Sequence, residues 1–492
     1  MAARTRAALA AIPIVLAAAL PDASAKAELQ PCRVTGIRHE VLCGQVRRAL
    51  DPARPDGPQI DVHYVVVPAM ARRKLADPLF LLAGGPGQSA IGVAPAMLGL
   101  FGRLNNRRDI VFVDLRGTGR SAPLDCDDDR DAPLAGQSDP DVQLRRLASC
   151  KAQLLARPYV QKESDLGFFT TTLAMQDLDA VRQQLGAAQI NLVGGSYGTR
   201  AALEYMRQFP QAVRRSVLDG VAPPDMVLPA SGSTDAQAAF DALLAACTAE
   251  ARCAAAYPRL RDDWVALLNS LPKDVTVTHP RTGRPERFTL TRDAVLGAVR
   301  GPLYGPAFAA GLPAAIAEAA QGRYEALVGL ADWLNPRRPA RLATGLHFSV
   351  ICAEDLPRLL AARDAPGRDF GTSFARVYEQ ACAQWPRGAV PAAFYTVPPF
   401  PRAVLLTSGS VDPATPPRHG ERIAAALGPS ARHVVVPNAG HGVLTIGCMR
   451  DVLFRFIDAP TEAQAQAVDT GCVTTIPRPP VFVPFHAAEG TK

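Results

Sequence analysis

The sequence predicts an α/β protein whose central sheet is mainly parallel, flanked by helices and interrupted by a large, mostly helical insertion. Short apolar runs recur along the chain, and segments with a helical spacing of apolar residues separate several of them. The alternation stops between residues 219 and 402, where Ala and Leu recur with helical periodicity. Strands that alternate with helices indicate parallel pairing, and the interruption indicates a helical insertion.

Seven apolar runs are the predicted strands, and the central ones are continuously apolar because a parallel strand is buried on both faces. Helices are predicted over 171–185 and 199–207, and a hairpin over 275–290. The predicted strands cover residues 60–67, 79–83, 110–113, 190–193, 216–218, 403–407 and 433–436.

The same pattern divides the chain into segments. Residues 26–222 and 401–473 are expected to form the two parts of the α/β core, and 223–400 a helical cap. Residues 474–492 are Pro-rich and are expected to lie extended on the surface. Ligands of open α/β sheets bind beyond the carboxyl ends of the strands, so a cap at that edge would shape substrate access.

The first 25 residues have the pattern of a secretory signal peptide. Arg4 and Arg6 precede an apolar run at 7–20, and Ala23-Ser24-Ala25 offers a small-x-small cleavage site. The run is shorter than the ~20 residues that span a bilayer, so we expect no stable membrane anchor after cleavage. We therefore predict a secreted or periplasmic protein.

The composition and charge of the chain exclude some classes of function. Hydrophobic residues make up 48% and charged residues 20% of the 492 positions, as in a soluble globular protein. The formal charge of +7 is spread along the chain without a block of five basic residues. This argues against a dedicated nucleic-acid surface, and we expect no nucleic-acid partner.

Ten cysteines follow the leader, an even number in a chain bound for an oxidising compartment. Zinc is the competing interpretation, but no CxxC pair and no clustered Cys/His spacing occurs, and we expect no metal. We predict the five sequential disulfides because each would close a local loop. The predicted pairs are Cys32 with Cys43, Cys126 with Cys150, Cys247 with Cys253, Cys352 with Cys382, and Cys448 with Cys472.

The stretch "INLVGGSYGTRAALEYM" at 190–206 breaks a predicted strand before a helix resumes. Gly194-x-Ser196-x-Gly198 in this context predicts a sharp strand-to-helix turn that presents the Ser196 hydroxyl in a pocket. At a helix N-terminus, backbone N–H groups favour a developing negative charge. A plain Gly-Ser turn is the alternative, since GxSxG also occurs by chance.

A second glycine-rich turn, "AGGPG" at 83–87, ends the strand predicted at 79–83. Such a turn can present a backbone N–H to a tetrahedral intermediate. Pro86 has no N–H, so Gly85 is the candidate donor, together with the N–H of Tyr197. The alternative is a tight turn without a catalytic role.

A base and an acid follow the last two predicted strands. His441, in "NAGHG", is expected to take the serine proton, and Asp412, in "SGSVDP", to orient the imidazole. Asp219, at the end of an earlier strand, is the rival acid. His419 and His433 are rival bases, which we expect to be structural or on the surface.

Five motifs occur in order along residues 83–442, and the pairing of GGPG with DxRGxGxS is much more specific than GxSxG. They are "AGGPGQSA" (83–90), "VFVDLRGTGRSAPLDC" (111–126), "NLVGGSYGTRAALEY" (191–205), "LLTSGSVDPATPP" (405–417) and "NAGHG" (438–442). Together they resemble the prolyl-iminopeptidase and tripeptidyl-aminopeptidase branch of the α/β-hydrolases. The large insertion and "ICAED" (351–355) look more like the secreted tripeptidyl aminopeptidases.

The resemblance implies an α/β-hydrolase fold with Ser196, Asp412 and His441 as the catalytic triad. It also implies hydrolysis of short peptides from a free N-terminus, without a metal or organic cofactor. The implied enzyme is a peptidase similar to tripeptidyl or prolyl aminopeptidases. Ala83 stands where many prolyl iminopeptidases have His before GGPG, which leaves the oxyanion donors intact but weakens the case for proline specificity.

An exopeptidase must recognise the ammonium group of its substrate, and a partly desolvated carboxylate can do so. Glu354 and Asp355, at the end of the insertion, are the candidates. The alternative is that they cap a helix or form a solvated pair.

Two alternatives to a peptidase are compatible with the same α/β scaffold. A carboxylic-ester hydrolase would share the acyl-enzyme chemistry, which does not distinguish the leaving groups. A catalytically silent binding protein is the second alternative, and an intact triad with both oxyanion elements argues against it.

Overall fold

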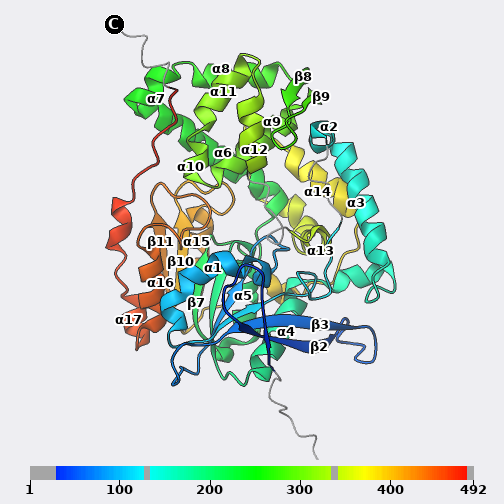
Figure 1. Cartoon of the computed structure of the whole chain (residues 1–492), viewed down its shortest axis with the longest axis vertical. Helices are drawn as coiled ribbons and strands as arrows, with labels where there is room; N and C mark the ends of the chain where they lie inside the picture. Colours follow the sequence, from blue (N-terminus) through cyan, green and yellow to red (C-terminus); the bar gives the residue numbers. More distant parts are fainter. Residues whose placement is uncertain (1–28, 127–132, 334–341, 485–492) are drawn as a thin grey trace, which may run out of the picture.

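The computed structural model describes residues 29–126, 133–333 and 342–484 (Figure 1). The predicted signal peptide at 1–25 lies outside these residues. Within them, no helix combines the length and the apolar character that a membrane crossing requires.

A nine-stranded sheet forms the centre of the core, in the spatial order β1-β2-β3-β5-β4-β6-β7-β10-β11. The pairings from β1 to β5 are antiparallel, and those from β5 to β11 are parallel. The strands are β1 (Gln30–Cys32), β2 (Val41–Ala49), β3 (Gln59–Val67), β4 (Leu79–Leu82), β5 (Ile110–Val113), β6 (Ile190–Gly195), β7 (Val213–Asp219), β10 (Val404–Gly409) and β11 (Ala431–Val436). The predicted α/β class with a mainly parallel sheet is confirmed.

Strands β1 and β2 are the part of the sheet that the sequence analysis missed. β2 reads VLCGQVRRA, and its glycine and two arginines leave no apolar run or clean alternation. Its pairing with β3 over residues 42–49 holds it in the sheet although the local sequence pattern does not predict a strand.

Helices cover both faces of the sheet because neighbouring strand residues point to opposite sides. In β4, Leu79 and Leu81 join the cluster that contains α1 and α16, whereas Phe80 and Leu82 join the cluster with α4 and α5. The helices of the core are α1 (Ala90–Asn105), α4 (Thr171–Gln184), α5 (Tyr197–Gln208), α15 (Pro417–Leu427), α16 (Met449–Asp458) and α17 (Glu462–Gln466).

Between β7 and β10 the chain forms a mostly helical cap with a hydrophobic cluster of its own, centred on Phe240 and Trp264. Figure 1 shows this cap above the sheet. Its elements are α6 (Leu228–Ala249), α7 (Ala251–Ala256), α8 (Leu260–Asn269), the hairpin β8 (Lys273–Thr278) and β9 (Pro285–Leu290), α9 (Arg292–Leu303), α10 (Pro306–Ala309), α11 (Leu312–Ala320), α12 (Glu325–Trp333), α13 (Thr344–Glu354) and α14 (Ser373–Ala383). Short 3₁₀ turns lie at Glu163–Phe168, Pro210–Ala212, Leu356–Ala361, Ala392–Tyr395 and Gly471–Thr475.

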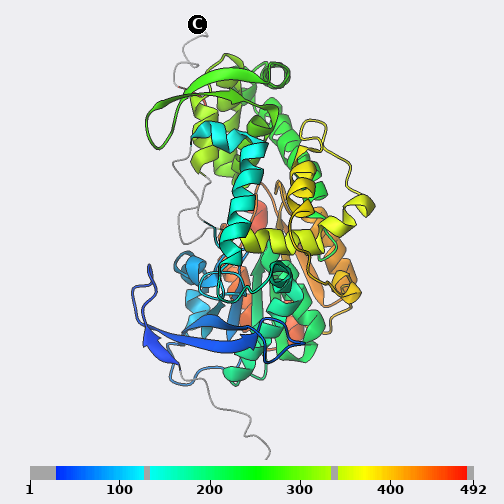
Figure 2. The ribbon, with the colours of Figure 1, turned by 90° about the vertical axis from the view of Figure 1, so that its right-hand side faces the viewer.

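Two helices from an earlier part of the chain also pack on the cap: α2 (Leu134–Ser138) and α3 (Pro140–Leu155). The N–H of Leu134 donates to Glu286 Oε2 at 2.8 Å, and the Leu134 side chain belongs to the cap cluster. Figure 2 shows α3, in cyan, rising from the core toward the cap. The cap is therefore built from two separate stretches of sequence, not from 223–400 alone.

The structure joins the ten cysteines in the five predicted sequential pairs. Three of these bridges tie one element to the next: β1 to β2, α6 to α7, and α13 to α14. After the last bridge, residues 477–484 run without helix or strand toward the cap. The N–H of Phe482 donates to the carbonyl of Ala310 there, at 3.0 Å.

Candidate active site

Ser196 occupies the sharp turn between β6 and α5. Its φ of +54° lies in a region that non-glycine residues rarely adopt, and its N–H donates to the carbonyl of Asp219 at 2.8 Å. Thr199 Oγ1 donates to the carbonyl of Ser196 at 2.7 Å and accepts the N–H of Ala222 at 2.8 Å. The surrounding backbone thus fixes the strained turn.

The two flanking glycines have a steric reason to be there. A Cβ on Gly194 would lie 2.4 Å from the carbonyl oxygen of Gly198, and a Cβ on Gly198 would lie 2.1 Å from that of Leu82. Any side chain would force α5 away from β4 and β6. Glycine at both positions therefore lets the serine sit directly above the sheet.

Asp412 and His441 meet beyond the ends of β10 and β11, which are parallel neighbours. His441 Nδ1–H donates to Asp412 Oδ2 at 2.8 Å. The hydroxyl of Thr415 also donates to Oδ2, at 2.8 Å, and the N–H groups of Ala414 and Thr415 donate to Oδ1 at 2.8 and 3.0 Å. The carboxylate is buried, and its hydrogen bonds fix it to face the imidazole.

The pKa values of this pair move apart. Burial opposes ionisation of Asp412, but the charge of His441 and the hydrogen bonds outweigh it and lower the pKa of the carboxyl below its ordinary value. Burial likewise opposes protonation of His441, but Asp412 outweighs it and raises the pKa of the imidazole above 6.5. The arrangement stabilises an imidazolium next to a carboxylate, as a general base in acyl transfer requires.

Ser196 and His441 border the same part of the molecule. A Cβ on Gly220, next to Asp219, would lie 3.3 Å from His441 Cε1, while Asp219 itself binds the N–H of Ser196. Within the described residues no hydrogen bond joins Ser196 Oγ to the imidazole. Such catalytic bonds often tighten only once substrate is bound.

Asp219, the rival acid, has a different task. Its carboxylate accepts the N–H groups of Val443 and Leu444 and the hydroxyl of Thr407, with a shortest distance of 2.8 Å. It thereby anchors the loop that follows His441, whereas the imidazole bonds to Asp412.

The rival histidines lie in structural contacts. His419 Nε2 is 2.9 Å from Asp235 Oδ2, and both side chains are buried. His433 Nε2 is 3.0 Å from the hydroxyl of Ser408, and burial lowers the pKa of His433. In the described part of the chain neither histidine bonds to Asp412, the carboxylate that His441 contacts.

The two candidate oxyanion donors lie beside the serine. Gly85 and Tyr197 line the same cavity as Ser196, and a Cβ on neighbouring Gly84 would lie 3.2 Å from Ser196 Cβ. In the described part of the chain, neither the Gly85 nor the Tyr197 N–H donates to a protein acceptor. Both N–H groups are thus available to a substrate carbonyl oxygen.

This cavity, here called the serine pocket, has a volume of about 280 Å³. The core supplies its floor with Ser196, and the cap supplies residues that sequence analysis did not single out: Arg300, Tyr304, His347, Phe374 and Tyr378. They come from three cap helices and one turn, and no local motif marks them. Within the described ranges no group of three or more His, Cys, Asp or Glu is placed to hold a metal ion.

His347 shows how the cap contacts the glycine-rich turn. Its Nδ1–H donates to the carbonyl of Pro86 at 3.2 Å, and its Nε2 accepts the hydroxyl of Tyr378 at 2.8 Å. Burial lowers the pKa of His347, so the ring is neutral and can make both bonds. This side chain links α13 and α14 to the turn that presents Gly85.

Glu354 and Asp355 require a correction, because neither lines the serine pocket and both are buried behind it. Asp355 forms a two-point ion pair with Arg200, at 2.7 and 3.2 Å, and accepts the N–H of Leu228. Glu354 accepts the N–H and hydroxyl of Thr171 at 2.7 and 3.0 Å, and burial raises the pKa of Glu354 to about 7. Their carboxylates hold the cap to the core and leave no open face for an ammonium group.

Two family models and several curated proteins match the sequence of this chain. Residues 77–299 match the family model described as alpha/beta hydrolase fold, and residues 367–472 match the model described as TAP-like protein. The serine protease Hip1 of Mycobacterium tuberculosis H37Rv is 27% identical over 476 residues, which cover 86% of this chain and 88% of the relative.

Two further relatives carry different names. The tripeptidyl aminopeptidase of Streptomyces lividans is 32% identical over 194 residues, covering 37% of this chain and 36% of its own length. Carboxylesterase B of Mycobacterium tuberculosis CDC 1551 is 29% identical over 415 residues, 78% of each chain. With the sheet order and the serine turn, these matches show that the chain is a serine hydrolase and belongs to the α/β-hydrolase family, in its TAP-like branch.

Proposed function

We propose that the protein is a secreted or periplasmic serine exopeptidase that cleaves short peptides from a free N-terminus, with Ser196, His441 and Asp412 as its triad. The observation that carries the proposal is the 2.8 Å hydrogen bond between His441 and Asp412 beside the strained serine turn. A serine hydroxyl needs such an oriented base to become a nucleophile.

In the acylation step, Ser196 Oγ attacks the carbonyl carbon of the scissile bond while His441 Nε2 takes the hydroxyl proton. The N–H groups of Gly85 and Tyr197 stabilise the oxyanion that forms. His441 then gives its proton to the leaving nitrogen as the C–N bond breaks, which leaves an ester on Ser196. Asp412 stays ionised and accepts the Nδ1–H throughout.

In the deacylation step, water attacks the ester carbonyl and His441 takes one of its protons. Collapse of the second tetrahedral intermediate breaks the bond to Ser196 Oγ, and His441 returns the proton to that oxygen. The products are the released carboxylic acid and the free enzyme.

The size of the serine pocket supports short substrates. The cap covers a cavity of about 280 Å³, and Arg300, Tyr304 and His347 border it opposite the core. A covered cavity of this size favours a short peptide over a folded protein chain as the substrate. The names of two relatives, serine protease and tripeptidyl aminopeptidase, also favour peptide hydrolysis.

Secretion is supported by two independent features. The sequence carries a leader-like segment at 1–25. Ten cysteines pair completely in the structure, as expected of a protein that folds in an oxidising compartment.

Ester hydrolysis is the second candidate function, because one relative that covers 78% of the chain is named a carboxylesterase. The decisive experiment is a digest of a peptide library, read by mass spectrometry, with Ser196→Ala as control. We expect fragments released from free N-termini and none from N-acetylated copies. Hydrolysis of short acyl esters without any peptide cleavage would favour the esterase, and cleavage by Ser196→Ala would refute the triad.

A further inference from the structure

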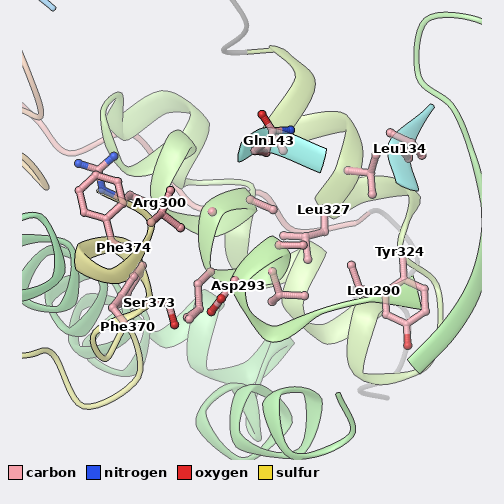
Figure 3. Close-up of a pocket in the computed structure, with 18 of the residues that line it drawn as sticks. Leu134, Gln143, Leu290, Asp293, Arg300, Tyr324, Leu327, Phe370, Ser373 and Phe374 are labelled. Atoms are coloured by element: carbon pink, nitrogen blue, oxygen red, sulfur yellow. The ribbon is translucent and has the colours of Figure 1, made fainter. Parts of the chain in front are cut away.

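The cap places a cation, Arg300, at the junction of two cavities. Arg300, on α9, lines the serine pocket and also a second cavity of about 400 Å³ inside the cap, here called the cap cavity. Phe374 lines both as well, so the two cavities meet at this pair of residues. Figure 3 shows Arg300 and Phe374 together at one end of the cap cavity.

We propose that Arg300 binds a carboxylate group of the substrate. This inference rests on the proposed function and narrows its substrate class to peptides that carry a carboxylate close to the scissile bond. The carboxylate can belong to an acidic side chain in the acyl part or to the free C-terminus of the leaving group.

The part of the chain that the structure describes gives Arg300 no partner for its charge. Among the described residues, no carboxylate forms an ion pair with it, and its buried Nε has no hydrogen-bond partner. Arg200, the other arginine of the serine pocket, differs because Asp355 neutralises it at 2.7 Å. Among the described residues that line the pocket, Arg300 is therefore an arginine whose charge is not compensated.

The carboxylates of the described residues do not supply the missing partner. No Asp or Glu of the ranges 29–126, 133–333 and 342–484 lines the serine pocket. Asp293 lines the cap cavity on the same helix, but seven residues of α-helix place it about 10 Å further along the axis. Arg300 is half-buried, with its Nε fully enclosed, so a ligand carboxylate at this point gains both charge neutralisation and charge-assisted hydrogen bonds.

Two aromatic rings contact the guanidinium of Arg300 and orient it. Its central carbon lies 5.4 Å from the ring centroid of Tyr304 and 5.1 Å from that of Phe374. Contacts of this kind fix the plane of an arginine and leave its N–H groups free to bind an anion at their edge. Tyr304 also contacts His441, which places the cation close to the reacting centre.

The walls of the cap cavity make this charge more effective. They are mostly apolar, and they include Leu134, Leu290, Val295, Leu296, Tyr324 and Leu327. An apolar environment strengthens the attraction between a guanidinium and a carboxylate. The same site should disfavour substrates with a Lys or Arg side chain, or an ammonium group, at this position.

The test uses matched substrates for the purified full-length protein. One peptide pair has the free C-terminal carboxylate or its amide, and a second pair has Glu or Gln in the acyl part with an amidated C-terminus. A third pair compares the p-nitrophenyl monoester of adipic acid with its methyl-capped neutral ester. We expect kcat/KM to favour the carboxylate at least about tenfold in one peptide pair, which also identifies its source.

The variants are Arg300→Gln and Arg300→Lys, with Arg252→Gln as the matched control on the exposed surface of α7. In Arg300→Gln the ratio of kcat/KM between the acidic and the neutral substrate should fall close to one. Arg300→Lys should retain part of the preference, because an ammonium keeps the charge but cannot make the two-point hydrogen bonds of a guanidinium. Arg252→Gln removes the same charge from the cap and should keep the wild-type ratio.

The outcomes separate the two proposals. Peptide cleavage through Ser196 with no carboxylate preference in the wild-type protein refutes the Arg300 site and leaves the exopeptidase standing. A carboxylate preference that persists in Arg300→Gln also refutes the Arg300 site and leaves the exopeptidase standing. Cleavage of the esters alone, with the acidic ester preferred and the preference lost in Arg300→Gln, supports the carboxylate site and refutes the peptidase.

Discussion

The backbone N–H of His441 donates a hydrogen bond to the carbonyl oxygen of Tyr304 at 2.8 Å, so a residue of the cap holds the candidate base. The two rings also meet edge to face, with their centroids 5.0 Å apart. This contact couples the cap to the triad, because a shift of the cap at Tyr304 would move the imidazole or break its bond.

Gly440 permits this contact and offers a direct test of it. A Cβ at this position would lie 2.3 Å from the Tyr304 carbonyl oxygen. We expect Gly440→Ala to lower kcat/KM by about a hundredfold, since a displacement near 1 Å in a catalytic group has effects of this size. Gly99→Ala on α1 is the control, because a Cβ there meets nothing within 4 Å. Wild-type kcat/KM in folded Gly440→Ala would show that the contact is dispensable.

Replacing Asp412 by Asn should lower kcat by about three to four orders of magnitude while the protein keeps its fold. The amide keeps the size of the side chain, but it cannot stabilise the imidazolium and it favours the wrong tautomer of His441. Steady-state kinetics on the best library peptide measures the loss, and circular dichroism checks the fold. A decrease of less than tenfold would remove Asp412 from the triad.

The pH profile of kcat/KM should report the pKa of His441. Only the neutral imidazole can accept the serine proton, so activity falls as the pH drops through that pKa, which the charge of Asp412 holds above 6.5 against the effect of burial. In Asp412→Asn the inflection should move to lower pH, because the partner charge is gone. An acid inflection at the same pH in both proteins contradicts this assignment.

Glu354 should make the folded state less stable as the pH rises. Burial raises its pKa from 4.5 to about 7, so its contribution is complete below pH 4.5 and is lost as the pH rises through about 7. The shift corresponds to about 3 kcal/mol, which Glu354→Gln should remove from the pH dependence of urea unfolding. Parallel stability curves for the two proteins between pH 4.5 and 8 would contradict it.

The same variant tests the corrected position of Glu354 relative to the substrate. Because its carboxylate lies behind the serine pocket and binds Thr171, Glu354→Gln should change KM for free-amine peptides and for N-blocked esters by the same factor. A selective rise in KM for the free-amine peptides would return Glu354 to the substrate site.

The sequence predicted those features whose signals are local or ordered along the chain. Buried parallel strands such as 110–113 appear as continuous apolar runs, and the turn at Ser196 needs glycines at both flanks. Asp412 and His441 follow adjacent parallel strands, so the topology itself brings them to one edge of the sheet. At these positions the local sequence pattern and the tertiary structure specify the same conformation.

The features that were missed depend on contacts between distant segments. Asp355 and Glu354 seemed available for a ligand until the fold placed Arg200 and Thr171, more than 150 positions away in the chain, against them. Likewise, Arg300 stands in an ordinary helical pattern, and only the packing of α9 against α6 and α12 within the cap places it at the serine pocket. Pairing of this kind leaves no periodic or motif signal in the sequence.

Covalent labelling with a fluorophosphonate probe, followed by peptide mapping, shows whether Ser196 is a nucleophile that His441 activates. We expect one modified residue, Ser196, labelled rapidly in the wild-type protein, far more slowly in His441→Ala and not at all in Ser196→Ala. Labelling at another residue, or the same rate with and without the imidazole, would contradict it.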